Sequence, residues 1–280
     1  VGIPTMAGLA KEYEAEASSL LSKIGFIPDN EKKQELLGNL ERLLELLYSM
    51  QFCSINGSLK TGSPSKEELD GHIVATKTFL RNKCLHVLKE DTLIQLYQRF
   101  YRKLLCRDRQ LPRVQVYTTN YDLMSEIAMD RSGIIYWNGF TGNVERRFNP
   151  ASYKFIVSER LDLRAEHWSA IDNFILLYKL HGSLNWRRHN SGSVTEIREY
   201  PISQIREEEA DAAIEEVMIY PTPGKVGASL STPYADLFRE FQSRLSSREH
   251  ILMTIGYGFG DEHINNLIFQ ALTIPSFRLV

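Results

Sequence analysis

The hydrophobic pattern of the second half of the chain predicts three strands that each end in a polar or glycine-rich loop. Residues 114–117 are apolar and run into polar residues up to Asp122, after which 123–129 have helical spacing. Residues 174–180 are almost continuously apolar, as expected for a strand buried on both faces. Residues 251–255 precede a glycine-rich loop and a further helical pattern. In open α/β sheets, loops at such strand ends line the crevice where ligands bind.

The first hundred residues carry the spacing of helices instead. Apolar positions predict helices over 9–26 and 31–50, and leucines form one stripe along the second of these. Ser65 and Glu68 have the spacing of a capping box, which predicts that a helix begins there. A last helix of this region is predicted over 92–105.

Shorter elements are predicted between the three main strands. Residues 134–137 and 153–157 have the composition of strands, and residues 185–193 that of a hairpin. Trp186 in this hairpin either covers a pocket or packs in the core, and packing is the commoner role of a tryptophan. Residues 234–245 are predicted to form an amphipathic helix.

Composition narrows the class of protein without defining its function. The 280 residues are 43% hydrophobic and 24% charged, with a formal net charge of −2, which is typical of globular proteins and compatible with one large domain or two smaller ones. This charge gives no sign of nucleic-acid or membrane-surface binding. No apolar run approaches the roughly 20 residues that span a bilayer, and the start does not resemble a signal peptide.

The three cysteines, Cys53, Cys84 and Cys106, are isolated in the sequence. Their spacing predicts neither a disulfide framework nor a zinc site, and a reducing, cytoplasmic setting is therefore expected. Each is interpreted as a small buried residue.

Four segments resemble parts of the sirtuin (SIR2) fold. Thr118-Thr-Asn-Tyr-Asp122 resembles its Thr-Gln-Asn-Ile-Asp motif, and Lys179-Leu-His-Gly-Ser183 resembles its catalytic His-Gly step. Gly256-Tyr-Gly-Phe-Gly-Asp261 resembles the late glycine loop of SIR2-like bacterial defence proteins. The opening residues 1–9 resemble the segment that follows the family's first strand and its Gly-Ala-Gly-x-Ser phosphate loop.

The resemblance implies an α/β fold of the three-layer, Rossmann-like sirtuin type with a mostly parallel sheet. Residues 1–280 would be a SIR2-like domain truncated at both ends, with a nucleotide-binding core over 111–280. Residues 10–110 would be a helical insertion that forms a lid in place of the family's zinc module. That module is built from two Cys-x-x-Cys pairs, which this sequence lacks, so no zinc is expected and peptide deacylation is disfavoured.

The resemblance also implies roles for individual residues toward NAD as a substrate. Asn120 would position the ribose hydroxyls or the attacking water, and His181 would be the general base, because imidazole changes its charge near neutral pH. Asp122 would hold the nicotinamide carboxamide. The remaining expected cofactor contacts are Thr118, Gly2, Pro4, Gly256, Gly258 and Asp261. Asn120 and Asp122 have the alternative role of turn or cap formers, and Asp261 that of a helix cap.

The implied activity is hydrolysis of NAD to nicotinamide and ADP-ribose, linear or cyclic, by an abortive-infection effector of anti-phage defence. Such an activity must be gated, so a homo-oligomer or a second defence-system protein or domain is expected, such as an ATPase or a phage-sensing module. The alternatives are a sensor that binds NAD or ADP-ribose without cleaving it, an NAD-dependent protein deacylase, and a scaffold with a decayed site.

Overall fold

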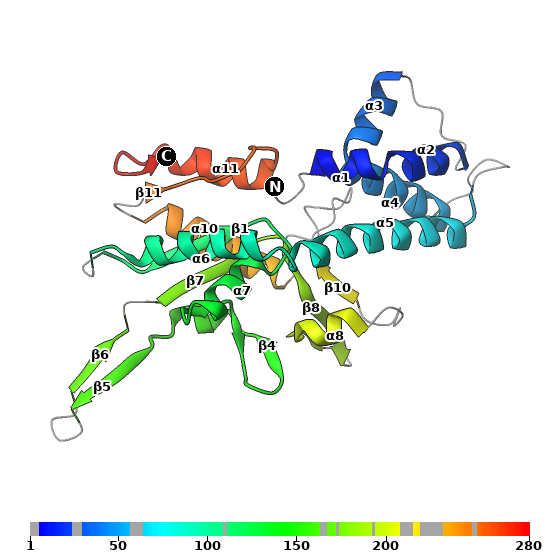
Figure 1. The fold of residues 1–280 in the computed structure, drawn as a ribbon. Coiled ribbons are helices and arrows are strands. Elements are labelled where there is room, and N and C mark those ends of the chain that lie inside the picture. The colour runs from blue at the N-terminus through cyan, green and yellow to red at the C-terminus, as the bar shows by residue number, and fades with distance from the viewer. Residues whose placement is uncertain are drawn as a thin grey trace.

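The protein has a mixed α/β architecture in which helices α1 to α5 lie together, and the remaining helices lie among the strands (Figure 1). The computed structural model describes residues 6–23, 30–56, 64–108, 111–162, 167–171, 174–191, 194–207, 215–218, 232–247 and 251–280. Gly2 and Pro4 therefore lie outside the described residues.

A three-stranded parallel sheet lies at the centre of the second half of the chain. Its strands are β1 (Val114–Thr118), β7 (Phe174–Lys179) and β2 (Ile135–Trp137), in the order β1-β7-β2. Val114 is paired with Ile175 and Thr118 with Lys179, so β1 and β7 end side by side. The strands predicted at these positions are confirmed, and the loops that follow β1 and β7 leave the same edge of the sheet.

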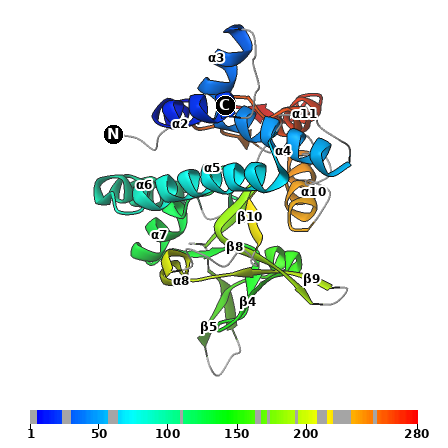
Figure 2. The same cartoon turned by 90° about the vertical axis from the view of Figure 1, so that its right-hand side faces the viewer.

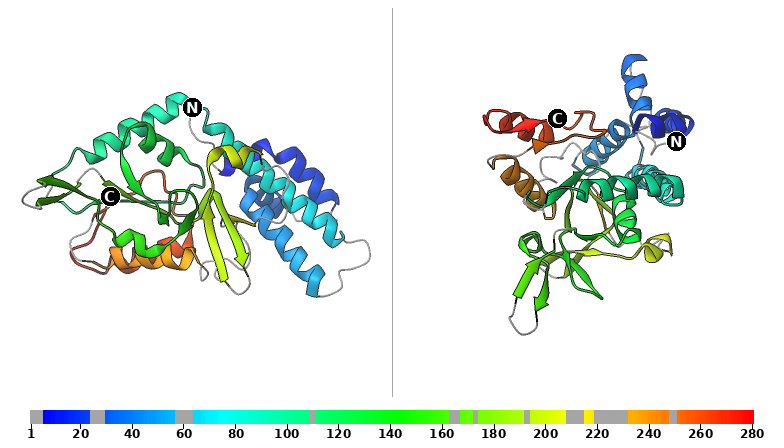
Figure 3. Two further views of the ribbon diagram at one scale, coloured as in Figure 1. Left: turned by 90° about the horizontal axis from the view of Figure 1, so that it is seen from below. Right: turned by 60° about the vertical axis from the view of Figure 1, so that its left-hand side comes forward.

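Helices cover both faces of this sheet, which gives three layers (Figure 3). On one face, Ile175 and Leu177 pack against α6 (Asp91–Leu105) and α7 (Met124–Arg131). On the other face, Leu176 and Tyr178 belong to a cluster with α10 (Tyr234–Leu245) and α11 (Glu262–Ala271). Alternate residues of β7 therefore enter two different cores, which explains its unbroken apolar sequence.

The largest sheet is antiparallel, contrary to the prediction of a mostly parallel arrangement. Its order is β10-β8-β9-β4-β3, and its five strands are β10 (Glu215–Met218), β8 (Gly182–Ser191), β9 (Val194–Glu199), β4 (Arg146–Phe148) and β3 (Phe140–Thr141). Two small pairs complete the strands: parallel β11 (Ile251–Leu252) with β12 (Arg278–Leu279), and antiparallel β5 (Ser158–Asp162) with β6 (His167–Ala170). The predicted hairpin is β8 with β9 and is confirmed.

The first part of the chain folds as a bundle with its own leucine-rich core, beside the sheets rather than over them (Figure 2). Its helices are α1 (Met6–Glu12), α2 (Glu14–Lys23), α3 (Asn30–Gly38), α4 (Leu40–Asn56) and α5 (Lys66–Val87). The predicted capping box is confirmed, because the Ser65 side chain accepts from the Glu68 amide while Glu68 accepts from the Ser65 amide. Leu184 of β8 enters the bundle core, and Tyr121 packs against it.

Two expectations were wrong. The strand predicted over 153–157 is absent, because Asn149 caps a 3-10 helix at Pro150–Lys154 (η1) and Pro150 suits the first turn of a helix. Cys53 and Cys106 are exposed rather than buried, although Cys84 is partly buried.

A short helix, α8 (Ile202–Glu207), follows β9. Among the described residues no helix has the length and apolar character needed to cross a bilayer.

Candidate functional site

Backbone hydrogen bonds join the segments that follow β1 and β7 at the carboxyl edge of the parallel sheet. The Leu180 amide donates to the Thr118 carbonyl at 2.9 Å, and the Leu184 amide donates to the Tyr121 carbonyl at 3.0 Å. The Tyr121 and His181 rings lie 6.3 Å apart, centroid to centroid. The sheet therefore brings together the two loops that were predicted from separate stretches of sequence, as the geometry of open α/β sheets requires.

Thr118 and Asn120 form the outer part of the first loop. The Thr118 hydroxyl accepts a hydrogen bond from the Asn120 amide at 3.1 Å, which fixes the turn. The Asn120 side chain is exposed, and the structure gives it no hydrogen bond to any described residue. The side-chain amide of Asn120 is therefore available for a ligand. The Thr118 hydroxyl, in contrast, stabilises the turn in addition to its predicted contact with the cofactor.

Asp122 is a buried turn former just before α7. Its Oδ1 accepts from the Met124 amide at 2.9 Å, so the alternative role as a turn former is confirmed. The charge of Asp122 also acts on neighbouring helices: burial, and after it this carboxylate, raises the pKa of both Cys84 and Tyr97 to about 12. Contact with a nicotinamide carboxamide stays a prediction and would depend on the second oxygen of Asp122.

His181 is held by Asp261, which comes from the distant glycine-rich loop. The imidazole Nε2 lies 2.8 Å from Oδ2 of Asp261, and the two side chains are only 12% and 13% exposed. Oδ1 of Asp261 accepts from the amides of His263 and Ile264 and so caps α11, as the cap alternative predicted. One carboxylate therefore both begins a helix and orients the histidine, and with Nε2 protonated it is Nδ1 that carries the free lone pair.

The glycine-rich loop is ordered by its own hydrogen bonds and faces open space. Asn265 donates to the Phe259 carbonyl at 2.8 Å, and Asn265 accepts from the Tyr257 hydroxyl at 3.0 Å. Gly256 has a φ of +66°, a left-handed conformation that favours glycine. A Cβ placed on Gly256 or Gly258 would meet no atom of the described residues within 4 Å. The backbone of this loop is therefore open to close approach by a ligand on the side of these two glycines.

Sequence reasoning missed the group that supports these loops from below, Lys179. This lysine is 1% exposed, and its Nζ donates to Glu126 Oε1 at 3.0 Å, to Ser183 Oγ at 2.8 Å and to the Tyr121 carbonyl at 3.3 Å. It also donates to the Asp122 carbonyl. Burial raises the pKa of Glu126, and the Lys179 charge partly opposes that rise. The sequence did offer a signal, because Lys179 interrupts an apolar run that was predicted to be buried on both faces. A buried lysine needs a charged or hydrogen-bonding partner, so its position indicated such a partner.

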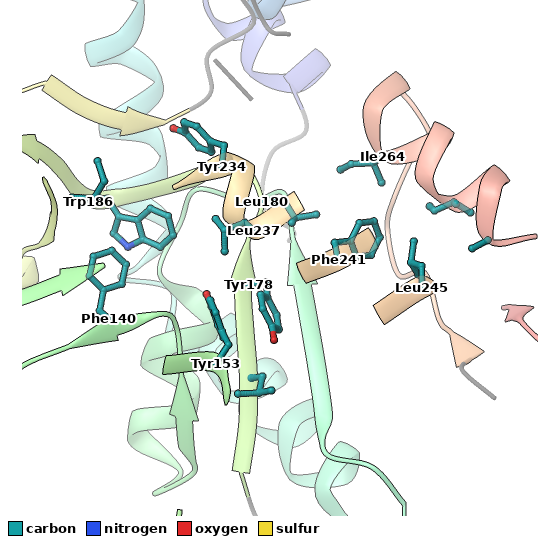
Figure 4. Close-up of a cluster of buried hydrophobic side chains, with 14 of the residues drawn as sticks. Phe140, Tyr153, Tyr178, Leu180, Trp186, Tyr234, Leu237, Phe241, Leu245 and Ile264 are labelled. Atoms are coloured by element: carbon teal, nitrogen blue, oxygen red, sulfur yellow. The ribbon is translucent and has the colours of Figure 1, made fainter. Parts of the chain in front are cut away.

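Trp186 does not cover a pocket. Its ring is fully buried in the core beneath α10 (Figure 4), with its centroid 4.9 Å from that of Phe140 and 6.2 Å from that of Phe148. The packing alternative is therefore confirmed. Among the described residues, no three side chains of His, Cys, Asp or Glu come together as metal ligands.

Comparison with known families identifies the domain that contains these loops. The model of the SIR2-like domain matches residues 114–274, which is more than half of the chain and runs from the first residue of β1 to just beyond α11. The match contains Thr118, Asn120, Asp122, His181 and the glycine-rich loop, and it excludes helices α1 to α6. No curated protein matches the chain. The chain belongs to the SIR2-like domain family.

Proposed function

We propose that this protein binds NAD at the carboxyl edge of β1 and β7 and hydrolyses the bond between nicotinamide and ribose. The observation that carries the proposal is the His181 and Asp261 pair at the end of β7, where the neighbouring loop after β1 carries the exposed Asn120. This is the edge where α/β sheets bind nucleotides. Membership of the SIR2-like family supports NAD as the ligand.

The residues present suit an NAD molecule. The glycine-rich loop leaves space where Gly258 and Gly260 carry no side chain, and neither glycine is needed there for packing against described atoms. The first amides of α11 already bind the Asp261 carboxylate, so a pyrophosphate would meet the backbone of the glycine-rich loop instead, where the missing side chains allow a close approach. We therefore place the phosphates near this loop and the nicotinamide end near Asn120.

In this arrangement, His181 is the general base. Water forms a bond to the ribose C1′ as the bond from C1′ to the nicotinamide nitrogen breaks, and nicotinamide leaves as a neutral molecule with the electron pair. Nδ1 of His181 takes the proton from the water and passes it to solvent, while the Asp261 carboxylate stabilises the charged imidazolium. Asn120 orients the ribose hydroxyls or the water, and Asp122 is proposed to hold the carboxamide.

We further propose that the products are nicotinamide and ADP-ribose, which is linear when water attacks C1′ and cyclic when an adenine nitrogen of the same molecule attacks C1′ in place of water. We also propose that the activity serves abortive infection in anti-phage defence. The resemblance of the glycine-rich loop to that of defence proteins supports this role. Unrestrained loss of NAD would harm the cell, so assembly into a homo-oligomer or a second defence protein is proposed to gate the site. Residues 10–110 would act as the lid that a zinc module forms in deacylating relatives, and contact of Tyr121 with the core of α1 to α5 supports this placement.

The test compares nicotinamide release by the intact protein with that of two variants, over a range of protein concentrations that allows self-assembly. Asn120→Ala and His181→Ala should each lower the rate roughly 100-fold or more, the effect typical of losing a positioned acid or base group. His86→Ala is the matched control, because His86 is an exposed histidine near the end of α5. If His181→Ala and His86→Ala release nicotinamide at the same rate, the assignment of the base is wrong.

A further inference from the structure

A second cavity lies on the other side of α7 from the helical bundle. Its volume is about 630 Å³, within the range of pockets that bind small molecules. Its walls come from α7, β2, the β3 to β4 connection, β8 and the residues between β9 and α8. Figure 2 shows α7, α8, β8 and β4 gathered in this part of the molecule. None of the residues predicted for the NAD site lines it.

Two buried side chains that line the cavity have an oxygen without a hydrogen-bond donor. Glu126 is 7% exposed, and while its Oε1 accepts from Lys179, its Oε2 has no partner. Asn185 is also 7% exposed, and its amide donates to the Tyr200 carbonyl, which identifies the unpartnered atom as the oxygen Oδ1. A buried acceptor without a donor is costly. Both oxygens have almost no accessible surface, so a ligand that brings N–H groups reaches them only after a small rotation of the side chain.

The charges around the cavity leave a negative surplus. Glu199 is neutralised by an ion pair with Arg146, and both also bind Asn138. Glu126 has its cation in Lys179. Asp130 is exposed and lines the cavity as well. It is hydrogen-bonded to Tyr136 and attracted by Arg146, yet it forms no ion pair with any residue that the structure describes. A positively charged occupant would complete this set of charges.

The remaining walls are partly aliphatic. The aliphatic residues are Leu123, Ile127, Ile134, Ile135, Val144, Pro201 and Ile202, and Tyr136, Asn143 and Tyr200 line the cavity as well. The aliphatic part suits a hydrocarbon chain better than a hydrated metal ion, and the described acidic side chains do not cluster closely enough to hold a metal. The chemistry required is therefore a short alkyl chain that carries an ammonium or guanidinium group.

We propose that this cavity is a second ligand site for a small aliphatic amine or guanidine, and that its occupant acts on residues 119–122 through Glu126 and Lys179. The path is short, because Lys179 Nζ binds Glu126 on one side and the main-chain carbonyls of Tyr121 and Asp122 on the other. A cation that binds Glu126 competes with Lys179 for the carboxylate. It therefore weakens or shifts the hydrogen bonds that Lys179 donates to the carbonyls of Tyr121 and Asp122. The inference does not depend on NAD cleavage.

Calorimetric titration of the intact protein with agmatine tests the site, with 1,4-butanediol as the uncharged probe of similar length. Agmatine should bind and butanediol should not. Asp130→Asn and Asn185→Ala should each weaken agmatine binding roughly tenfold, the scale of a hydrogen bond to a charged group. Asp236→Asn in α10 makes the same chemical change outside the cavity and should leave the affinity unchanged.

The proposal is overturned if agmatine does not bind at millimolar concentration, if butanediol binds as well as agmatine, or if the cavity variants bind as tightly as Asp236→Asn. Asp130→Asn keeps the test usable should Asn185→Ala fail to fold, because Asp130 lies at the surface. Hydrogen exchange tests the proposed effect of the occupant on the loop after β1. Saturating agmatine should change the exchange rates of amides in residues 119–124. Unchanged rates in a protein that binds agmatine would refute the link through Lys179.

Discussion

Replacing Lys179 by methionine should destabilise the protein strongly, because it keeps the length of the side chain and removes the charge at the centre of a buried network. Glu126 would lose its cation, and Ser183 and the carbonyls of Tyr121 and Asp122 would lose a donor. Breaking one partner of a buried ion pair typically costs about 3–5 kcal/mol. The additional unpaired acceptors place the expected loss of unfolding free energy toward the upper part of that range.

The loss should depend on pH with a defined sign. Burial raises the pKa of Glu126 in the folded protein, and Lys179 opposes that rise, so the variant should raise this pKa further. A carboxyl whose folded pKa is raised stabilises the protein fully below its unfolded pKa of about 4.3, and that stability is lost as pH rises through the folded value. Lys179→Met should therefore be closer to the parent at pH 5 than at pH 8.

Urea unfolding at pH 5 and pH 8 measures both effects. The double variant Lys179→Met with Glu126→Leu should recover much of the loss, because no charge then remains buried without a partner, and its stability should vary less with pH. A Lys179→Met protein within 1 kcal/mol of the parent at pH 8, or one whose loss relative to the parent is larger at pH 5 than at pH 8, would refute the reasoning.

Further predictions concern the glycine-rich loop, its carboxylate and the first long helix. Gly256→Ala should cost about 1–2 kcal/mol of unfolding free energy because of its positive φ, whereas Gly258→Ala, which has open space and no such φ, should stay within about 0.5 kcal/mol; equal effects in denaturant titrations would contradict this. Asp261→Asn should retain its cap and its melting temperature but slow nicotinamide release roughly tenfold or more through the loss of charge beside His181, and a variant with parental kinetics would remove Asp261 from the mechanism. Ser65→Ala should cost about 0.5–2 kcal/mol, measured by thermal unfolding, and an unchanged midpoint would show that the capping box adds nothing.

Local sequence patterns were enough to predict the elements that carry the site. The helix at 234–245 was predicted with the bounds that α10 has, and the capping box before α5 rests on two side chains only three residues apart. The strand β7 was visible because both of its faces are buried in different cores. The strand expected at 153–157 failed because the preceding Asn149 and Pro150 favour a helical turn over the apolar pattern that follows them.

The contacts that organise the site were beyond sequence reasoning because they join residues far apart along the chain. Glu126 and Lys179 come from α7 and β7, and His181 and Asp261 from two loops with several elements between them. Nothing in the residues around Asp261 distinguishes a simple cap from a cap that also binds a histidine. Only the packing of α11 against the sheet brings that carboxylate to the imidazole.

The central claim is that this SIR2-like protein cleaves NAD with water, and a product balance tests it most directly. The intact protein would be incubated with NAD in the absence of any acylated peptide, and nicotinamide and ADP-ribose, linear and cyclic together, would be quantified by chromatography. We predict equal amounts of nicotinamide and ADP-ribose from the parent protein and neither product from His181→Ala. A protein that binds NAD but releases no nicotinamide in any assembly state, or releases it only when an acylated peptide is added, would contradict the account.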